Sequence, residues 1–407
     1  MPKVLQINVT VNWGSHGKIA EMIGRKAIDR GWDSYIAYGR NMTPSQSRVI
    51  KIGSSADFYF HVLGTRITGR HGLFSSSATK KFIKDIERIK PDVIHFHNIH
   101  GYYLNYKILF EYLNKCNIPV IITMHDNWIF TGHCTNYAHI CDKWKTLCGP
   151  CPVYKEYPSG LIDHSRSDYI LKKELFTKIK NLTLVPVSQW TGSFVSNSFL
   201  SGARVVCIHN GIDTERFRIY EERSTICTKY NIPFEKKMII GVASIWAKHR
   251  GYEDFVKLSS LLDDTYVIVL VGVDDKLKKN LPNGFVGIKR TDNVDELAML
   301  YSAALLYMTP TWKDNFPTTN IEALACGTPV VTYNTGGSPE AIDEQTGFVV
   351  EQGDIKGLKS AVEAIVSKGK DYYKNKCRSR ALTLYNMDVQ YNKYIDMYEN
   401  MLKQIKN

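Results

Sequence analysis

The stretch from Thr309 to Glu340 constrains the fold of this chain more than any other, because it joins a loop, a helix, a strand and a glycine loop within a short span. Ile321, Leu324 and Ala325 have the i, i+3, i+4 spacing of a helix that packs one face on a sheet. The apolar run Pro329–Tyr333 then predicts a short buried strand. Alternation of amphipathic helix and buried strand is typical of an α/β protein with a parallel sheet.

Two carboxylates mark the approach to this helix, since Asp314 and Glu322 stand eight positions apart. Carboxylates so placed can bind the hydroxyls of a sugar and of a ribose. The alternative for Glu322 is structural, because Thr319 and Glu322 fit the S/T-x-x-E capping box and the Glu would then bond back to the helix start. Further on, the glycine loop Asn334–Gly337 leads into a second predicted helix start at Ser338. Helix N-termini of this kind bind anions.

Resemblance to a known family begins here, in DNFPTTNIEALACGTPVV followed by TGGSPE. This pair of segments is similar to the C-terminal signature of the retaining family 4 glycosyltransferases, of the kind acting in bacterial surface polysaccharide synthesis. The resemblance implies an α/β chain with the GT-B fold, in which two Rossmann-like, doubly wound domains face each other across a cleft. The family has Glu, seven residues and Glu where this chain has Asp314 and Glu322. We therefore expect an unusual sugar preference at Asp314.

The same resemblance implies a domain organisation. Residues 1–212 correspond to an N-terminal, acceptor-side Rossmann-like domain with a cysteine-rich insert at 131–152. Residues 213–385 correspond to a C-terminal Rossmann-like domain that binds the nucleotide sugar, and residues 386–407 to a helix that crosses back onto the first domain. The Asn-Gly turn within His209–Asp213 marks the passage between the two domains.

The resemblance also implies which residues of this chain bind the donor. Arg250 stands where the family has its phosphate-binding Lys, and Ser244 replaces the family's Arg, so we expect Lys248 to supply the second contact to the diphosphate. The alternative for Lys248 is a solvated basic turn. Asp314 would bind the sugar hydroxyls and Glu322 the ribose. Further donor-binding residues implied by the resemblance are Gly14, Gly17, Lys289, Arg290, Phe316, Thr318, Thr319, Gly336 and Gly337. The residues assigned to catalysis are His125, Asp314, Glu322 and Arg250, and no catalytic metal is expected because fixed positive groups take its place.

Polar residues end three predicted strands of the N-terminal half. The first strand, Val4–Val9, leads into Gly14 and Gly17, one glycine short of the dinucleotide fingerprint, which disfavours an NAD-dependent oxidoreductase. Two later strands end in histidines, and ligands bind at the carboxyl ends of strands in open α/β sheets. The candidate acceptor-side residues are His97, Asn98, His100 and Asp126, beside His125 in the T-x-H-D segment that the family turns towards the donor sugar. A purely structural histidine is the alternative at each position.

Four of the nine cysteines crowd into eighteen residues, and in a reducing compartment disulfides are disfavoured there. A structural zinc bound by thiolates is one interpretation, because the closing C-x-x-C has the spacing of zinc ligands. Buried or surface thiols are the alternative. The candidate ligands are Cys134, Cys141, Cys148 and Cys151.

The net charge of +12 suits an anionic partner, which could be nucleic acid, a membrane surface or phosphate-bearing substrates. The chain begins with a strand-like segment, lacks the features of a signal peptide, and has no run of about 18 apolar residues, so we expect a cytoplasmic protein. Basic and apolar residues interleave between His61 and Lys90. That segment predicts either peripheral contact with the anionic inner face of the plasma membrane or an ordinary surface helix with a core-facing stripe.

The leading functional hypothesis is a hexosyltransferase that moves a sugar, with retention, from a nucleotide diphosphate sugar to a glycan or lipid-linked saccharide. A basic nucleic-acid-binding protein with a zinc-stabilised insert is the rival from another class, but it leaves the Asp314–Glu340 motifs without a role, so no nucleic acid partner is expected. A sugar-nucleotide epimerase or phosphorylase on the same fold needs only a different acceptor or an additional base. Saturable protection by a nucleotide diphosphate would favour the transferase over the nucleic-acid-binding protein.

Overall fold

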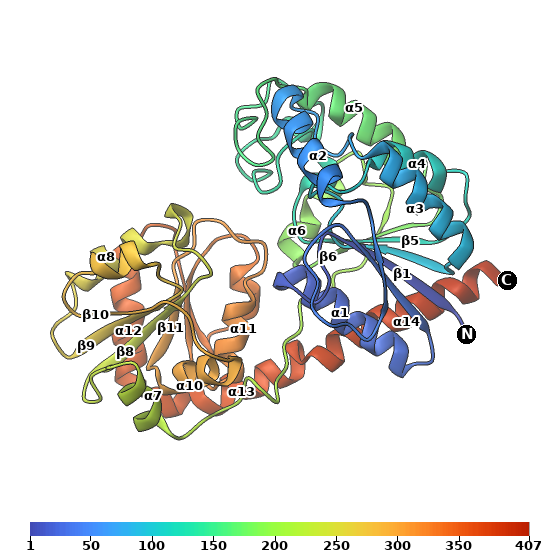
Figure 1. Cartoon of the computed structure of the whole chain (residues 1–407). Coiled ribbons are helices and arrows are strands. Elements are labelled where there is room, and N and C mark those ends of the chain that lie inside the picture. The colour runs from blue at the N-terminus through green and yellow to red at the C-terminus, as the bar shows by residue number, and fades with distance from the viewer. Residues whose placement is uncertain (407) are drawn as a thin grey trace. The chain divides into compact units, whose positions relative to one another are not determined.

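The computed structural model describes residues 1–406 and divides the chain into two compact units (Figure 1). Unit 1 comprises Met1–His209 together with the C-terminal segment from Tyr391, and unit 2 comprises Asn210–Gln390. Each unit is built on one parallel β-sheet with helices around it, which confirms the predicted α/β class with two Rossmann-like domains. Among the described helices, none combines the length and the apolar character needed to cross a membrane.

The sheet of unit 1 has seven parallel strands in the order β3-β2-β1-β4-β5-β6-β7. The order reverses direction between β1 and β4, where residues such as Val4 and Val93 are in register. In open α/β sheets this switch point is where ligands bind, outside the carboxyl ends of the strands. The strands are β1 Lys3–Asn8, β2 Asp33–Tyr38, β3 Arg48–Lys51, β4 Val93–Phe96, β5 Val120–Met124, β6 Leu182–Pro186 and β7 Arg204–Val205.

Helix α3 covers part of this sheet by burying one stripe of its side chains. Its buried residues Thr79, Phe82, Ile86 and Ile89 recur at helical spacing, while its lysines face solvent. The core-facing stripe expected for a surface helix is therefore correct for α3. The helices are α1 Gly14–Asp29, α2 Ser55–Thr68, α3 Ser76–Ile89, α4 Tyr106–Leu113, α5 Ser165–Phe176 and α6 Gln189–Ser193, with the 3-10 turns η1 Trp128–Phe130, η2 Lys143–Lys145 and η3 Val195–Asn197.

Helix α14, Met387–Lys406, ends the described chain and packs into the core of unit 1. The Tyr398 hydroxyl lies 2.6 Å from Nδ1 of His95 on β4, and the Tyr394 hydroxyl lies 3.2 Å from Oγ1 of Thr123 on β5. Both tyrosines are almost fully buried. The last helix is therefore an integral part of the support beneath the central strands of unit 1.

The sheet of unit 2 has six parallel strands in the order β10-β9-β8-β11-β12-β13. They are β8 Lys237–Val242, β9 Tyr266–Val271, β10 Phe285–Ile288, β11 Leu306–Thr309, β12 Val330–Tyr333 and β13 Gly347–Val350. The buried strand predicted at Pro329–Tyr333 is β12. The helices are α7 Arg223–Lys229, α8 Tyr252–Ser259, α9 Asp275–Lys279, α10 Val294–Ala303, α11 Thr318–Ala325, α12 Ile355–Lys368 and α13 Lys370–Tyr385, with the 3-10 turns η4 Lys248–Arg250 and η5 Ser338–Ala341.

Candidate functional site

In unit 1 the predicted acceptor-side residues meet at the carboxyl ends of β4 and β5. His97, Asn98, His100, His125 and Asp126 all line one hollow at this edge of the sheet. They meet because β4 and β5 are adjacent parallel strands, so the loops that follow them emerge side by side. The structure thus brings together every acceptor-side residue that the sequence singled out.

A stack of imidazole rings runs through this region. His125 stacks on His16 at a centroid separation of 4.4 Å, and its Nε2 lies 3.3 Å from Nδ1 of His97. The Gln6 side chain donates to the Ala20 carbonyl, so its Oε1 faces Nε2 of His97 at 2.8 Å as an acceptor. His97 therefore donates to Gln6 through Nε2 and accepts from His125 through Nδ1.

These stacked rings are held in the neutral form. Burial lowers the pKa of His16, His97 and His125, and positive charge on neighbouring imidazoles would lower it further. At His16 the Asp126 charge opposes this shift, but the pKa remains lowered. The predicted glycine loop at Gly14–Gly17 is wrong in detail, because these residues form the first turn of α1 and present His16 to the stack. Positive φ angles at Asn12 (48°) and Gly14 (66°) turn the chain and allow the helix to begin early.

A second polar group in unit 1 consists of Tyr157, His100 and Asp126. The Asp126 Oδ2 lies 2.6 Å from Nε2 of His100, and Nδ1 of the same ring lies 3.1 Å from the Tyr157 hydroxyl. Burial raises the pKa of Asp126, but the His100 contact and the Trp128 amide outweigh burial and lower it overall. Burial raises the pKa of Tyr157. Tyr157 was missed by the sequence analysis because it lies 57 positions from its partner, outside every motif.

The loop that carries His125 and Asp126 is fixed from beneath by Lys172 of α5. Its ammonium donates to the carbonyls of Trp128 at 2.7 Å and Thr131 at 2.9 Å, and lies 3.3 Å from the centre of the Trp128 ring. Burial lowers the pKa of Lys172 to about 7. A buried lysine of this kind has no signature in the sequence, because it sits at an ordinary helical position.

The cysteine-rich insert gathers its thiols without forming a complete ligand set. Cys134, Cys141, Cys148 and Cys151 line one small cavity together with His133, and all four are free thiols. Burial raises the pKa of Cys134 to about 12 and that of Cys148 to about 11. Within the part of the chain that the structure describes, no three His, Cys, Asp or Glu side chains are placed to hold a metal ion.

In unit 2 the predicted diphosphate and sugar residues contact each other. Arg250, at the end of η4, donates through Nη1 to Oδ2 of Asp314 at 2.6 Å. The two side chains are 64 positions apart and both are partly exposed. They meet because β8 and β11 are adjacent strands, and the loops after them lie together. Lys248 is exposed on the same turn.

The glycine loop of unit 2 presses against the Asp314 loop. Gly336 has φ of 59°, and a Cβ atom there would lie 1.7 Å from the Asp314 carbonyl oxygen, so only glycine fits. The loop is also pinned by Ser338, whose Oγ accepts from Asn320 at 2.9 Å and lies 2.6 Å from Oγ1 of Thr332. The predicted second helix after Gly337 is only the 3-10 turn η5.

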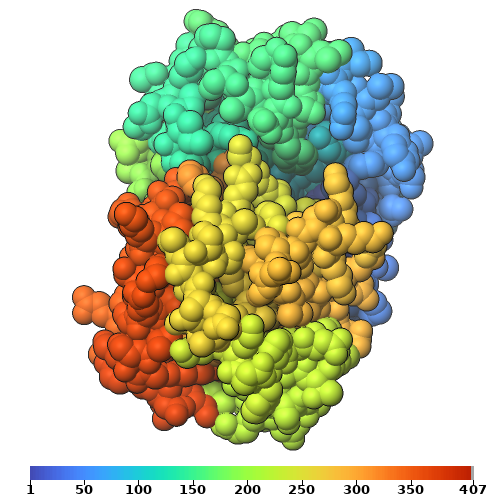
Figure 2. Space-filling model, turned by 90° about the vertical axis from the view of Figure 1, so that its left-hand side faces the viewer, coloured from blue at the N-terminus to red at the C-terminus, as the bar shows by residue number. Residues whose placement is uncertain are grey.

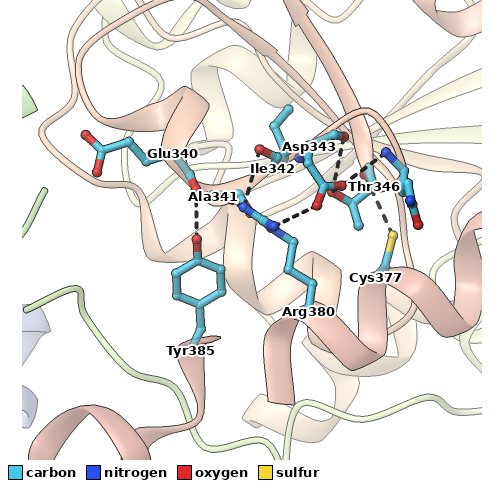
Figure 3. Close-up of polar contacts among 9 residues, drawn as sticks. Glu340, Ala341, Ile342, Asp343, Thr346, Cys377, Arg380 and Tyr385 are labelled. Atoms are coloured by element: carbon cyan, nitrogen blue, oxygen red, sulfur yellow. Dashed lines mark hydrogen bonds and ion pairs between the residues drawn. The ribbon is translucent and has the colours of Figure 1, made fainter. Parts of the chain in front are cut away.

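Helix α13 supports this loop from the other side (Figure 3). Arg380 donates through Nε to the Ala341 carbonyl at 2.8 Å and through Nη1 to Oδ2 of Asp343 at 2.6 Å. The Tyr385 hydroxyl donates to the Glu340 carbonyl at 2.8 Å. These contacts hold η5 in place, and with it the backbone amides that follow Gly336.

Glu322 does not cap α11. The helix begins at Thr318 after Pro317, with no side-chain cap, so the capping-box interpretation is wrong. Glu322 instead lies in the second turn, where its Oε2 accepts from the Tyr301 hydroxyl at 3.2 Å. Thr319 accepts from the Tyr307 hydroxyl at 2.8 Å. Tyr301 of α10 and Tyr307 of β11 therefore both orient the first turns of α11.

The other donor-binding residues implied by the resemblance are spread over unit 2. Phe316 is buried before α11, and its ring lies 5.9 Å from that of Tyr385. Lys289 and Arg290 follow the edge strand β10, which β9 separates from β8. Lys289 pairs with Asp275 at 2.7 Å and both side chains are exposed. The structure thus joins Arg250, Asp314 and Gly336 in one cluster and leaves Lys289 and Arg290 at the edge of the sheet.

Comparison with known proteins identifies the class of both halves. The family description "Glycosyltransferase Family 4" matches residues 18–216, and "Glycosyl transferases group 1" matches residues 236–368. The chain is 24% identical to the putative colanic acid biosynthesis glycosyl transferase WcaC of Escherichia coli K12, over 98% of this chain and all of that protein.

Two further matches extend this picture. A Campylobacter jejuni protein named N,N'-diacetylbacillosaminyl-diphospho-undecaprenol alpha-1,3-N-acetylgalactosaminyltransferase is 23% identical over 54% of this chain and 60% of its own length. Among solved structures, Anabaena HepE in complex with UDP superimposes with a TM-score of 0.67 at 14% identity, covering 98% of this chain and all of HepE. The likeness to solved glycosyltransferases confirms the predicted GT-B fold.

Proposed function

The chain belongs to the family 4 glycosyltransferases, and we propose that it transfers a sugar, with retention, from a nucleotide diphosphate sugar to a saccharide acceptor in cell-surface polysaccharide synthesis. The observation that carries the proposal is the cluster of Arg250, Asp314 and Gly336 in unit 2. It offers a guanidinium, a carboxylate and a backbone loop that only glycine can form. Relatives named for colanic acid and capsular polysaccharide synthesis support the assignment to that process.

Unit 2 would bind the donor. Departure of the nucleotide diphosphate develops negative charge, and fixed positive groups that face this charge lower the barrier. Arg250 and the exposed Lys248 supply such charge, and the amides after Gly336 and at the start of α11 supply hydrogen-bond donors. Asp314 forms an ion pair with Arg250, so donor binding would exchange that pair for contacts to phosphate and sugar hydroxyls.

Unit 1 would supply the acceptor side. His125 is held neutral by burial and by its contact with His97, so it suits a hydrogen-bonding wall against a sugar better than a proton donor. In the proposed step the acceptor oxygen forms a bond to the anomeric carbon as the bond to the donor phosphate breaks on the same face. The acceptor proton passes to the departing phosphate oxygen, so the step balances without a protein nucleophile.

Glu322 provides the direct test of the donor site. Its carboxylate accepts from Tyr301 and, in the proposal, binds the ribose of the nucleotide. We expect Glu322→Ala to lose at least tenfold in kcat/KM, whereas Glu322→Gln keeps part of the binding. Nucleotide-sugar turnover at the wild-type level in Glu322→Ala would remove this residue from the site.

A thermal-shift screen with UDP, GDP, ADP and their sugars would identify the donor, because ligands that bind the native state raise the melting temperature.

Helix α2 supports a peripheral membrane location. Tyr59, Phe60, Leu63 and Ile67 share one face of α2, and each is more than half exposed. Leu161 and Ile162, also exposed, adjoin the end of this helix, because the Leu161 amide donates to the Arg66 carbonyl at 2.8 Å. In Figure 2 the blue surface of unit 1, which includes the α2 region, borders its green surface, which includes the region near residue 160. Apolar rows flanked by basic residues bind anionic bilayers at the headgroup level. We therefore propose contact with the anionic inner face of the plasma membrane, which a cytoplasmic transferase would reach, and sedimentation with vesicles of defined anionic lipid content tests it.

For the cysteine-rich insert we propose a structural zinc site. The support is the convergence of Cys134, Cys141, Cys148 and Cys151 on one cavity, together with the tetrahedral thiolate coordination that zinc prefers. Binding requires the thiols to turn towards one another, since they do not form a ligand set among the described residues. Metal analysis of freshly reduced protein should find one zinc per chain, and Cys148→Ser should lower that content. Absence of zinc from such preparations would remove the site.

A further inference from the structure

Trp312 lies in the loop after β11, two residues before Asp314, and has no role in the chemistry above. Its indole Nε1 donates to Oδ2 of Asp254, in the first turn of α8, at 2.6 Å. The Asp254 carboxylate is almost fully buried, and the Lys257 ammonium lies 3.8 Å from its Oδ1. A buried carboxylate is costly unless hydrogen bonds satisfy it, so this contact fixes where the Trp312 loop meets α8.

The backbone joins the same two segments. The Trp312 amide donates to the His249 carbonyl at 2.8 Å. Beside this bond, Gly251 has φ of 78°, and a Cβ atom there would lie 2.1 Å from the Pro310 carbonyl oxygen, so only glycine fits. His249 and Gly251 are the two neighbours of Arg250 in the chain. These contacts therefore set the position of the Arg250 backbone against the loop that carries Trp312.

Trp312 is also joined to the glycine loop through one side chain. The Gln352 amide nitrogen donates to the Trp312 carbonyl at 3.1 Å and to Oγ1 of Thr335 at 3.0 Å. Thr335 directly precedes Gly336, which packs against the Asp314 carbonyl. Trp312 is thus connected, directly or through Gln352, to each of the three loops that form the donor-site cluster.

The ion pair between Arg250 and Asp314 is too exposed to hold these loops by itself. The Arg250 side chain is 36% exposed and that of Asp314 is 18% exposed, and ion pairs that solvent reaches contribute little to stability. A hydrogen bond to a buried carboxylate contributes more, because the carboxylate would otherwise be left without a donor. The buried contact of Trp312 with Asp254 therefore places the loops, and the loops place the guanidinium.

We propose that Trp312, through its hydrogen bond to Asp254, is a positioning residue that holds Arg250 and Asp314 in the arrangement that receives the donor diphosphate. Trp312 acts through these two residues and does not contact the donor. A guanidinium that is already fixed loses less conformational freedom when phosphate binds, so binding is tighter. This inference rests on the proposed transferase function and adds a residue to its donor site.

The first test follows hydrogen exchange of the full-length chain without ligand. Trp312→Phe keeps an aromatic ring and removes the indole donor. Exchange should become at least fivefold faster in residues 247–252 and 311–316 and should stay unchanged in β8 and β9. Asp254→Asn should show a smaller acceleration in the same segments, because the side-chain oxygen of Asn can still accept the indole proton.

The matched control is Tyr230→Phe. It removes an aromatic donor from a carboxylate in the same unit, since the Tyr230 hydroxyl donates to Oε2 of Glu296 at 2.6 Å. Neither of the two segments followed in the first test should exchange faster in this variant.

The second test measures affinity by calorimetry, with whichever of UDP, GDP and ADP binds the parent chain most tightly. Arg250→Gln should raise the Kd at least tenfold, Trp312→Phe about fivefold, and Tyr230→Phe not at all. In the double variant Arg250→Gln/Trp312→Phe, the second substitution should add less than a twofold rise, because Trp312 acts through Arg250.

Three outcomes would overturn the inference. Unchanged exchange in both segments of Trp312→Phe would show that the indole bond does not hold the loops. An equal acceleration throughout unit 2 would show a general loss of stability in place of positioning. Independent rises in Kd in the double variant would show that Trp312 does not act through Arg250. A parent chain that binds none of the three nucleotides, or an Arg250→Gln variant that binds as the parent does, would instead remove the proposed donor site, so the two failures are distinguishable.

Discussion

The two units share a parallel sheet flanked by helices, yet they place different chemistry at their strand ends. Every histidine except His249 lies in unit 1, where several imidazoles are buried and held neutral. Unit 2 instead places an arginine, a carboxylate and a glycine loop at the corresponding edge of its sheet. Neutral rings suit neutral hydroxyl groups, whereas a guanidinium and backbone amides suit a diphosphate. The comparison shows that two similar folds can suit different ligand groups because of the few residues that follow each strand.

The largest expected effect concerns the charge in unit 2. Arg250→Gln should lower kcat by about 100- to 1,000-fold, because it removes a fixed donor aimed at the developing charge. Lys248→Gln should cost much less, since this side chain is exposed and its charge is screened. Initial rates with the identified donor measure both. Equal losses in the two variants would show that net charge, and not the Arg250 position, is what matters.

Glycine at position 336 gives the next largest effect. Gly336→Ala should destabilise unit 2 by about 3 kcal/mol, because the left-handed backbone and the contact with the Asp314 carbonyl both oppose a side chain. The matched control is Gly284→Ala, where φ is also positive but nothing lies within 4 Å, and the expected cost is about 1 kcal/mol. Denaturant unfolding compares the two variants. A Gly336→Ala chain as stable as Gly284→Ala would contradict the close packing of the two loops.

Acid should lower the stability of unit 1 more than that of unit 2. Burial lowers the pKa of His61 to about 4 and that of His95 to about 3, while in the unfolded chain both titrate near 6.5. Above pH 6.5 both states are neutral; as the pH falls from 6.5 towards 4 only the unfolded chain takes up these protons. Each such histidine should therefore lower the stability of unit 1 by about 1.4 kcal/mol per pH unit in this range. Burial also raises the pKa of Asp168 to about 6, so this one carboxyl group stabilises unit 1 as the pH falls, which is opposite to the effect of the histidines.

Hydrogen exchange at pH 7 and pH 5, corrected for the intrinsic pH dependence of exchange, measures how much stability each unit loses in acid. Peptides from β4 and β5 should lose more protection than peptides from β8 and β9, because unit 2 has only His249. Parallel loss of protection in both units would contradict the role of the buried histidines.

The smallest effects come from two tyrosine hydroxyls. Tyr398→Phe should cost about 2 kcal/mol, because it leaves a buried nitrogen of His95 without its partner. Tyr307→Phe removes a bond to Thr319, which is partly exposed and can turn to water, so about 1 kcal/mol is expected. Urea unfolding gives both values. A larger cost for Tyr307→Phe would mean that the first turn of α11 depends on this bond more than unit 1 depends on its buried network.

Local pattern was sufficient for much of the fold. The buried run at Pro329–Tyr333 and the helix with Ile321 and Leu324 appear in the structure as β12 and α11. Histidines after predicted strands also led to the hollow that His97 and His125 line. Local pattern failed at Thr319 and Glu322, where the same residues fit both a capping box and a binding site. The capping box requires the helix to begin after Thr319, but α11 begins at Thr318, directly after Pro317.

The sequence by itself determined the α/β class, the glycine loop at Asn334–Gly337 and the residues that end each strand, because periodicity and backbone preference act over a few neighbouring positions. Only the tertiary structure decided which of these residues meet. Contacts form between Arg250 and Asp314, which are 64 positions apart, between His100 and Tyr157, which are 57 apart, and between His95 and Tyr398, which are 303 apart. Such pairs arise from strand order and helix packing, which place distant segments side by side, and no local pattern encodes that order.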